Sequence, residues 1–176
     1  MISLDDLLYM IGQGLGIVAV ILGFVSYQMK LPRGIILTQL ATAMVFAAHY
    51  LLIGAVTAAV LNFLAGLKCI AYYFRDKRGS RSLVEPIVFI VLVIVSGILT
   101  WESWYSIALM LGLVVDTVGL AMPDAQMTRR FVFVKSPLCL LYNAMVFSVG
   151  GIIYECAVLI SSVIGLMKYR EVDASR

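Results

Sequence analysis

The chain has 176 residues, of which 62% are hydrophobic and 13% are charged, and its mean hydropathy is +1.03. Soluble domains are about 45–50% apolar and about 25% charged, so this composition leaves too few polar side chains to cover a core in water. The net charge of +3 is too small to indicate a nucleic-acid partner. The sequence therefore predicts an integral membrane protein whose main partner is the lipid bilayer.

Apolar segments follow one another along the chain, and each has about the length of one bilayer crossing, roughly 20 residues. Residues 84–100 are rich in Val and Ile, which favours a strand in water, but an isolated strand in lipid leaves its backbone groups unpaired. We therefore expect a helix there too, and tight turns at Gly54 and at Gly150-Gly151. The expected helices are 7–29, 34–53, Gly54 to 74, 84–100, 103–122, 130–149 and Gly151 to 169.

The basic residues indicate how the chain is oriented. They follow the first, third, fifth and seventh segments, whereas the other connections hold no Lys or Arg. Connections rich in Lys and Arg stay on the cytoplasmic side of a membrane. We therefore predict a multi-pass protein of the inner membrane, with its N-terminus outside and its C-terminus in the cytoplasm. Asp5 and Asp6 precede the first segment, which favours a retained anchor over a cleaved signal peptide.

The second half of the chain repeats the helix and charge pattern of the first. Leu22-Gly23-Phe24 resembles Leu111-Gly112-Leu113, and Gly66-Leu67-Lys68 resembles the segment 165–168. The prediction is one all-α membrane domain over 1–176, with about seven transmembrane helices. It comprises a first three-helix repeat at 7–74, a linker helix at 84–100 and a second repeat at 103–169. A single linking helix makes the two repeats parallel.

Several short segments carry a family resemblance. The stretches His49–Gly54, Leu61-Asn62, Tyr142-Asn143 and Ser148–Glu155 resemble the YgjV-type bacterial inner membrane proteins, over nearly the whole chain. That family is distantly similar to the PQ-loop and SWEET superfamily, which includes small transporters and a trafficking receptor. The resemblance implies a compact carrier and supplies no binding residues. Only Pro137 lies inside a helix of either repeat, which departs from the proline hinges of those carriers.

One set of polar residues lies toward the predicted outer side. Counting about 1.5 Å per residue places its members roughly 6–10 Å from the outer ends of their helices. We expect these residues to face one cavity that binds a small polar solute. A His and a Glu there would also suit proton coupling. Alternatively, the Asn side chains only link helices and the Glu lies among the headgroups. The set is His49, Asn62, Tyr142, Asn143 and Glu155.

A second set lies toward the predicted inner side. Asp116, Lys135 and Lys68 are each about 9 Å from the inner ends of their helices by the same count. An unpaired carboxylate in lipid would cost several kcal/mol, so we expect Asp116 to pair with one of the two lysines. The sequence does not decide which lysine it is. The pair would act as a cytoplasmic gate or as a structural bridge.

The remaining motifs favour no enzyme. No nucleophile has a placed base, no cofactor or metal spacing is present, and the three cysteines suit neither a metal site nor a disulfide framework. Gly12 and Gly16 form a small-residue face for a dimer contact or for internal packing, and whether the chain is a monomer or a homodimer stays open. Two functions compete: a permease for a small polar solute, and a non-transporting module that acts as an assembly factor or a partner-binding receptor.

Overall fold

The computed structural model describes residues 4–169, which form seven α-helices and contain no strand, so the predicted helical class and helix number are confirmed. The helices are α1 (Leu4–Gln28), α2 (Pro32–Leu52), α3 (Val56–Lys77), α4 (Val84–Leu99), α5 (Ser106–Leu120), α6 (Ala125–Met145) and α7 (Val149–Lys168).

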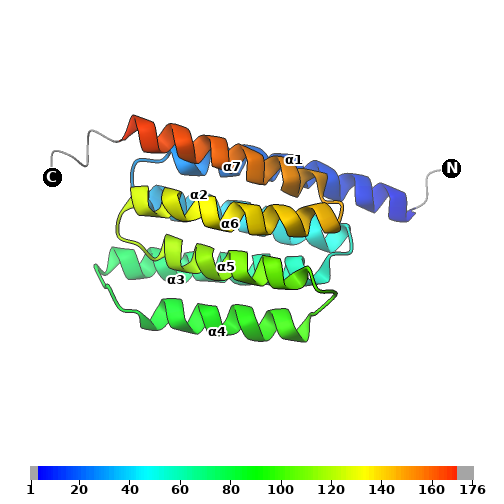
Figure 1. Cartoon of the computed structure of the whole chain (residues 1–176), viewed down its shortest axis with the longest axis horizontal. Helices are drawn as coiled ribbons and strands as arrows, with labels where there is room; N and C mark the ends of the chain where they lie inside the picture. The colour runs from blue at the N-terminus through cyan, green and yellow to red at the C-terminus, as the bar shows by residue number, and fades with distance from the viewer. Residues whose placement is uncertain (1–3, 170–176) are drawn as a thin grey trace.

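The helices form a closed ring. Each helix packs against the next one along the chain, α7 closes the ring against α1, and α3 also contacts α5 directly. In Figure 1, α1, α2 and α3 lie behind α7, α6 and α5, and α4 lies at the edge beside α3 and α5. The connections that follow α1, α3 and α5, and the end of α7, gather at the left of the figure. The basic residues in or beside these connections therefore share one end of the bundle.

The surface of the bundle is apolar, unlike that of a soluble protein. Large apolar side chains face outward, as Ile21 and Leu99 do at 63% and 80% exposed. The interior has an apolar core and also buries polar and charged groups, among them Lys68, Arg129 and Glu155. Since exposed apolar belts and buried, paired charges suit lipid and not water, this pattern supports a membrane protein.

Helix length and composition agree with that environment. In the part of the chain that the structure describes, four helices are long and apolar enough to cross a bilayer: Asp6–Gln28, Pro32–Leu52, Val56–Lys77 and Val149–Lys168. The apolar helices α4 and α5 are shorter, at 16 and 15 residues. α6 has the length but also contains Arg129, Arg130 and Lys135. Arg129 and Lys135 are buried while Val134 is 57% exposed, so much of the polar surface of α6 faces the other helices.

The helix boundaries that differ most from the sequence prediction are the two ends of α6. α6 begins at Ala125 and not near 130, because the side chain of Asp124 accepts a hydrogen bond from the Gln126 amide and caps the helix. The turn before α7 lies at Phe147, whose φ is +51°, and not at Gly150-Gly151. The predicted turn at Gly54 is present, with φ +80°.

The glycines at the start of α7 serve helix packing. Ser148 caps α7, and Gly150 lies within its first turn. A Cβ on Gly16 of α1 would lie 2.8 Å from the Gly150 Cα, and one on Gly12 would lie 3.0 Å from the side chain of Ile53. Such separations leave no room for a side chain. The small-residue face of α1 is therefore used inside the molecule.

Candidate functional site

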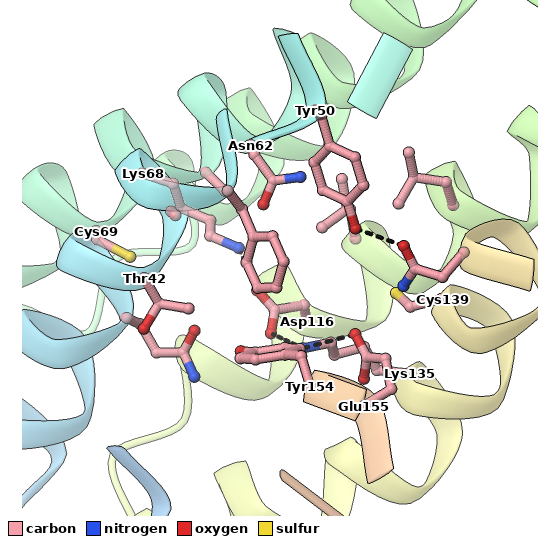
Figure 2. A pocket seen from close by; sticks show the side chains of 17 residues that line it. Thr42, Tyr50, Asn62, Lys68, Cys69, Asp116, Lys135, Cys139, Tyr154 and Glu155 are labelled. Carbon is pink, nitrogen blue, oxygen red and sulfur yellow. Dashed lines mark hydrogen bonds and ion pairs between the residues drawn. The ribbon is translucent and has the colours of Figure 1, made fainter. Parts of the chain in front are cut away.

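Four ionisable side chains meet at the centre of the bundle (Figure 2). Lys68 Nζ lies 2.6 Å from Asp116 Oδ2, and Lys135 Nζ lies 3.8 Å from Asp116 Oδ1. Lys135 Nζ also lies 3.9 Å from Glu155 Oε1. These residues come from α3, α5, α6 and α7. We call Lys68, Asp116, Lys135 and Glu155 the charged tetrad.

The tetrad balances its own charge. It contains two ammonium groups and two carboxyl groups, and its side chains are between 2% and 18% exposed. Removing one ion from water costs several kcal/mol, and removing the partner of a buried ion leaves an uncompensated charge. The four groups can therefore remain ionised in the bilayer only as long as they stay together. The sequence left open which lysine pairs with Asp116, and in the structure both lysines lie close to it.

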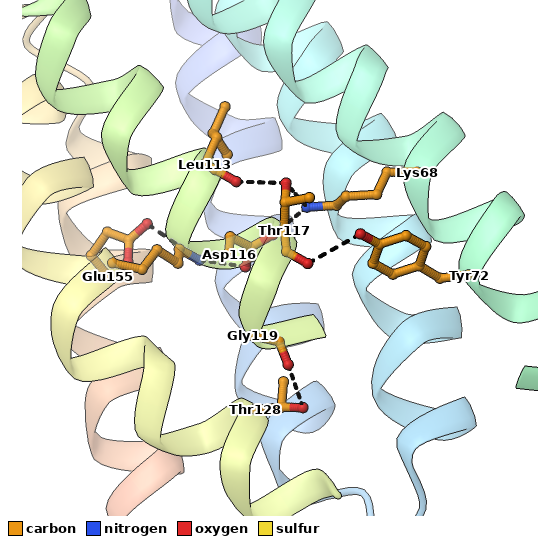
Figure 3. A network of polar contacts seen from close by, with 9 residues as sticks. Lys68, Tyr72, Leu113, Asp116, Thr117, Gly119, Thr128 and Glu155 are labelled. Atoms are coloured by element: carbon orange, nitrogen blue, oxygen red, sulfur yellow. Dashed lines mark hydrogen bonds and ion pairs between the residues drawn. The ribbon is translucent and has the colours of Figure 1, made fainter. Parts of the chain in front are cut away.

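Neighbouring groups hold the Lys68–Asp116 pair in place (Figure 3). Lys68 Nζ also lies 3.4 Å from Thr117 Oγ1, and that hydroxyl donates to the Leu113 carbonyl at 2.7 Å. The Tyr72 hydroxyl donates to the Thr117 carbonyl at 3.1 Å. These bonds tie α3 to α5 at the level of the pair.

A small cavity adjoins the tetrad. The space that the centres of water molecules can occupy is about 50 Å³. A space of this size holds a few waters or one small ion, and it is well below the roughly 300–1,000 Å³ typical of ligand pockets. The lining residues are Gln39, Thr42, Ala43, Phe46, Tyr50, Asn62, Ala65, Lys68, Cys69, Leu109, Leu113, Asp116, Lys135, Cys139, Asn143, Tyr154 and Glu155.

Two polar atoms of this lining lack a hydrogen bond of ordinary geometry within the described part of the chain. Gln39 Nε2 can donate and Glu155 Oε2 can accept, and both atoms are buried, with Tyr154 near Gln39 and with Ser136 and Cys139 near Glu155. Buried polar groups in native proteins are nearly always paired. A small polar occupant of the cavity would supply what these two atoms lack.

Three of the predicted outer residues line this cavity. They are Asn62, Asn143 and Glu155. The Asn143 Oδ1 accepts from the Tyr50 hydroxyl at 2.5 Å, while Asn62 Nδ2 donates to the Ala58 carbonyl of its own helix at 2.9 Å. The three lie together with the predicted inner residues, so one site holds members of both sets.

The other two predicted outer residues do not line the cavity. His49 is fully buried, with Nδ1 2.7 Å from the Gly12 carbonyl and Nε2 2.7 Å from Ser148 Oγ, so it links α1, α2 and the start of α7. Tyr142 is fully buried as well and donates to Glu102 Oε2 at 3.2 Å. The expectation that all five share one cavity is therefore corrected.

The two sets meet because α6 starts earlier than predicted. Lys135 lies ten residues after Ala125, which is about 15 Å along the helix and not about 9 Å. Its ammonium group therefore reaches the middle of the bundle, where Glu155 approaches from α7.

Sequence reasoning missed Arg129, which it placed in a loop. Its side chain is 1% exposed, and it donates from Nε to the Tyr27 carbonyl at 3.0 Å and from Nη2 to the Met29 carbonyl at 2.6 Å. Arg129 thus caps the C-terminal end of α1 from α6. The capping Asp124, five residues earlier, is the signal that would have placed Arg129 inside a helix.

The described residues contain no candidate metal site. Within the described residues, no group of three or more His, Cys, Asp or Glu side chains is arranged to hold a metal ion. The cysteines Cys69, Cys139 and Cys156 are free, and the first two are buried beside the cavity.

Comparison with known proteins identifies the family but no relative of known function. No curated protein and no solved structure matches the chain. The profile of the Imp-YgjV family, described as bacterial inner membrane protein, matches residues 10–172. A similarity to the PQ-loop and SWEET superfamily is not shown. The predicted family and membrane are thereby confirmed, and the chain belongs to the YgjV family of bacterial inner membrane proteins.

Proposed function

We propose that the protein transports a small polar solute or ion across the inner membrane, and that the charged tetrad and its cavity form part of the pathway. The observation that carries this proposal is the meeting of four ionisable side chains from four helices around a cavity in which two polar atoms lack a hydrogen bond of ordinary geometry. Ionisable groups inside a membrane are costly, and they mark ion and proton paths in many membrane proteins. We propose no enzymatic activity.

The helix order supports two parallel repeats for such a transporter. A half-turn about the bundle axis would exchange α1, α2 and α3 with α5, α6 and α7, and α4 would lie outside the exchange. One pair of contacts follows the same rule. Tyr72 of α3 donates to the Thr117 carbonyl of α5, and Tyr169, just after α7, donates to the Gln28 carbonyl of α1. Rocking of one repeat against the other is a known route to alternating access.

The cavity narrows the class of solute. At about 50 Å³ the cavity admits a few waters or a small ion. In this conformation, protons and small ions are therefore better candidates for the transported solute than sugars and amino acids. Proton coupling would use Glu155, because this carboxyl group both joins the tetrad and has one oxygen without a hydrogen bond of ordinary geometry.

The test is flux into proteoliposomes that contain the purified full-length protein. A pH-sensitive dye inside the vesicles would report proton movement, alone and with a panel of small ions, organic acids, amino acids and sugars. We expect flux in the wild type, loss in Glu155→Gln and Asp116→Asn, and retention in Glu102→Gln. Glu102 is the matched control, since it bonds Tyr142 and the Thr57 amide outside the tetrad. Wild-type vesicles that stay silent across the panel would contradict transport.

The tight Lys68–Asp116 pair and the small cavity favour one alternative, a non-transporting module whose polar interior only holds the helices together. Such a protein would act as an assembly factor or a receptor through its basic connections. Photo-crosslinking groups at Lys77 and Arg130 would then capture one discrete partner in cells, and flux would be absent.

A further inference from the structure

A second and larger pocket opens at the basic end of the bundle. Its volume is about 630 Å³, within the range of 300–1,000 Å³ typical of ligand pockets. It lies between the ends of α3 and α5 and the start of α4, and Pro32 and Ile36 of α2 complete it. The tetrad does not line this pocket, so the proposed transport function does not use it.

The polar part of the pocket has excess positive charge. Arg75 is 8% exposed, donates to the Ala121 carbonyl and lies over the Tyr72 ring at 4.7 Å, yet its Nε has no partner in the described residues. Arg81 adds an exposed guanidinium from the connection between α3 and α4. Asp76, the acidic residue of the lining, is already paired with Arg33. The pocket therefore suits an anionic group.

The rest of the pocket is apolar and elongated. Leu83, Ile87 and Ile90 line it from one side of α4, at spacings of four and three residues, which place them on one helix face. From Leu83 to Ile90 the helix rises by seven residues, so these side chains extend over about 10 Å of the pocket. Val118 and Leu120 of α5 line the pocket as well. An anionic head and an apolar chain along α4 match this division.

We propose that this pocket binds an anionic phospholipid from the leaflet that contacts the basic connections. The phosphate would lie at Arg75 and Arg81, and an acyl chain would lie along Leu83, Ile87 and Ile90. Arginine is well suited to phosphate because its planar guanidinium can donate two parallel hydrogen bonds. Anionic lipids already gather beside basic segments through their surface potential, which favours filling of the pocket.

Native mass spectrometry of the full-length protein in a neutral detergent tests this proposal. The probes are phosphatidylglycerol, phosphatidylcholine with the same acyl chains, and glycerol 3-phosphate. We expect one tightly retained phosphatidylglycerol per chain, bound about tenfold more tightly than phosphatidylcholine, since hydrogen bonds to charged groups are the stronger ones. Equal retention of the two lipids would overturn the proposal, and tight binding of glycerol 3-phosphate would replace the lipid by a soluble anion.

Two matched pairs of variants locate the site. Arg81→Gln should weaken retention of phosphatidylglycerol about tenfold, whereas Arg130→Gln, the same change at an exposed basic residue outside the pocket, should not. Ile87→Trp should displace the acyl chain, whereas Val91→Trp should leave binding unchanged, because Val91 is similarly exposed, at 53% against 57%, but does not line the pocket. Equal effects within either pair would mean that the lipid binds elsewhere.

Discussion

Within the described residues, the members of the tetrad and Arg129 each reach a partner on another helix. Asp116 pairs with lysines from two other helices, and Arg129 donates to carbonyls at the end of α1. Polar side chains elsewhere do the same on a smaller scale, as Ser161 does when its hydroxyl donates to the Phe24 carbonyl at 2.6 Å. In lipid, where apolar contacts between helices gain little over contacts with acyl chains, such links decide which helices associate.

The Lys68–Asp116 pair should dominate the energetics of the tetrad. We expect Asp116→Asn to lower the free energy of unfolding by about 3–5 kcal/mol, because it leaves Lys68 buried without its counter-charge. Lys68→Met together with Asp116→Asn should recover much of that loss. The measurement is equilibrium unfolding of the purified protein in mixed micelles.

Asp76→Asn is the control for this cycle. Asp76 pairs with Arg33 at the surface, where both side chains are more than one-third exposed, so the expected loss is about 0–1 kcal/mol. If the two single substitutions cost the same, or if the double variant is no more stable than Asp116→Asn alone, the buried pair does not couple as described.

The polar residues of the candidate site could be selected from the sequence, but the residues that they contact could not. Asn62, Asn143, Glu155 and the charged residues stand out because polar groups are rare in apolar segments. His49 stands out for the same reason, yet it packs against Gly12 and Ser148 and does not face the cavity. Which way a side chain points depends on the rotation of its helix, and that rotation is set by contacts between distant segments.

At the scale of the helix, ends are closed by residues from other helices. Arg129 and Tyr169 cap carbonyls at the end of α1, and Arg75 caps the end of α5. The last carbonyls of a helix have no partner within it, and the negative end of the helix dipole favours a cation there. These caps fix α1 and α5 at the basic end of the bundle.

Removal of the α1 cap should therefore destabilise the protein. We expect Arg129→Gln to lower the free energy of unfolding by about 2–4 kcal/mol, since two carbonyls lose charged donors that are buried with them. Arg130→Gln, one residue away and exposed, should change it by less than about 0.5 kcal/mol. Thermal unfolding of both variants in the same detergent gives the comparison, and equal melting temperatures would refute the cap.

The contact of α1 with α7 gives a second test at this scale. Gly16→Ala should destabilise by about 1–3 kcal/mol, because its Cβ would lie 2.8 Å from the Gly150 Cα, where backbone meets backbone. Gly14→Ala should be neutral or stabilising by up to about 1 kcal/mol, because its Cβ would meet nothing within 4 Å and Ala favours helix over Gly. A Gly16→Ala variant as stable as Gly14→Ala would mean that the helices can separate without cost.

Helices could be located from the sequence more securely than their ends. Apolar length and basic connections predict seven helices, and the positive φ of Gly54 follows from its place between two apolar segments. The start of α6 and the turn before α7 differ from their predicted positions because of the conformation of single residues. Asp124 caps a helix that begins with polar residues, and Phe147 takes a left-handed conformation usually left to glycine.

At the scale of the whole molecule, composition alone predicts the membrane class, and the family profile agrees with it. The central cavity, in contrast, could not be predicted from composition. It exists because α6 brings Lys135 to the level of Glu155, and because α3 contacts α5 directly. Both facts depend on how the helices of the ring fit against one another, and hydropathy contains no information about that fit.

The basic residues predict the orientation of the bundle. Because those in or beside the connections share one end, we expect that end and the C-terminus to face the cytoplasm. Alkaline phosphatase fused after residue 176 should be inactive, and a green fluorescent protein at the same place should be bright. Fusions within the connection at 100–105, which lacks Lys and Arg, should give the reverse. A phosphatase active only at the C-terminus would invert the topology.

The polar composition of α6 bears on how the protein is made. A Lys at the centre of a helix opposes its insertion by about 2.5–3.5 kcal/mol, and Lys135 lies at the centre of α6. Arg129 and Arg130, nearer the start of the helix, add smaller costs, so a nascent α6 partitions poorly into lipid alone. The partners of these basic residues are synthesised at different times. α1, which supplies the carbonyls, and α5, which supplies Asp116, precede α6, whereas Glu155 follows within α7. α6 should therefore leave the translocon only together with partner helices. α1 and α5 would already be in the bilayer, and α7 would insert soon afterwards.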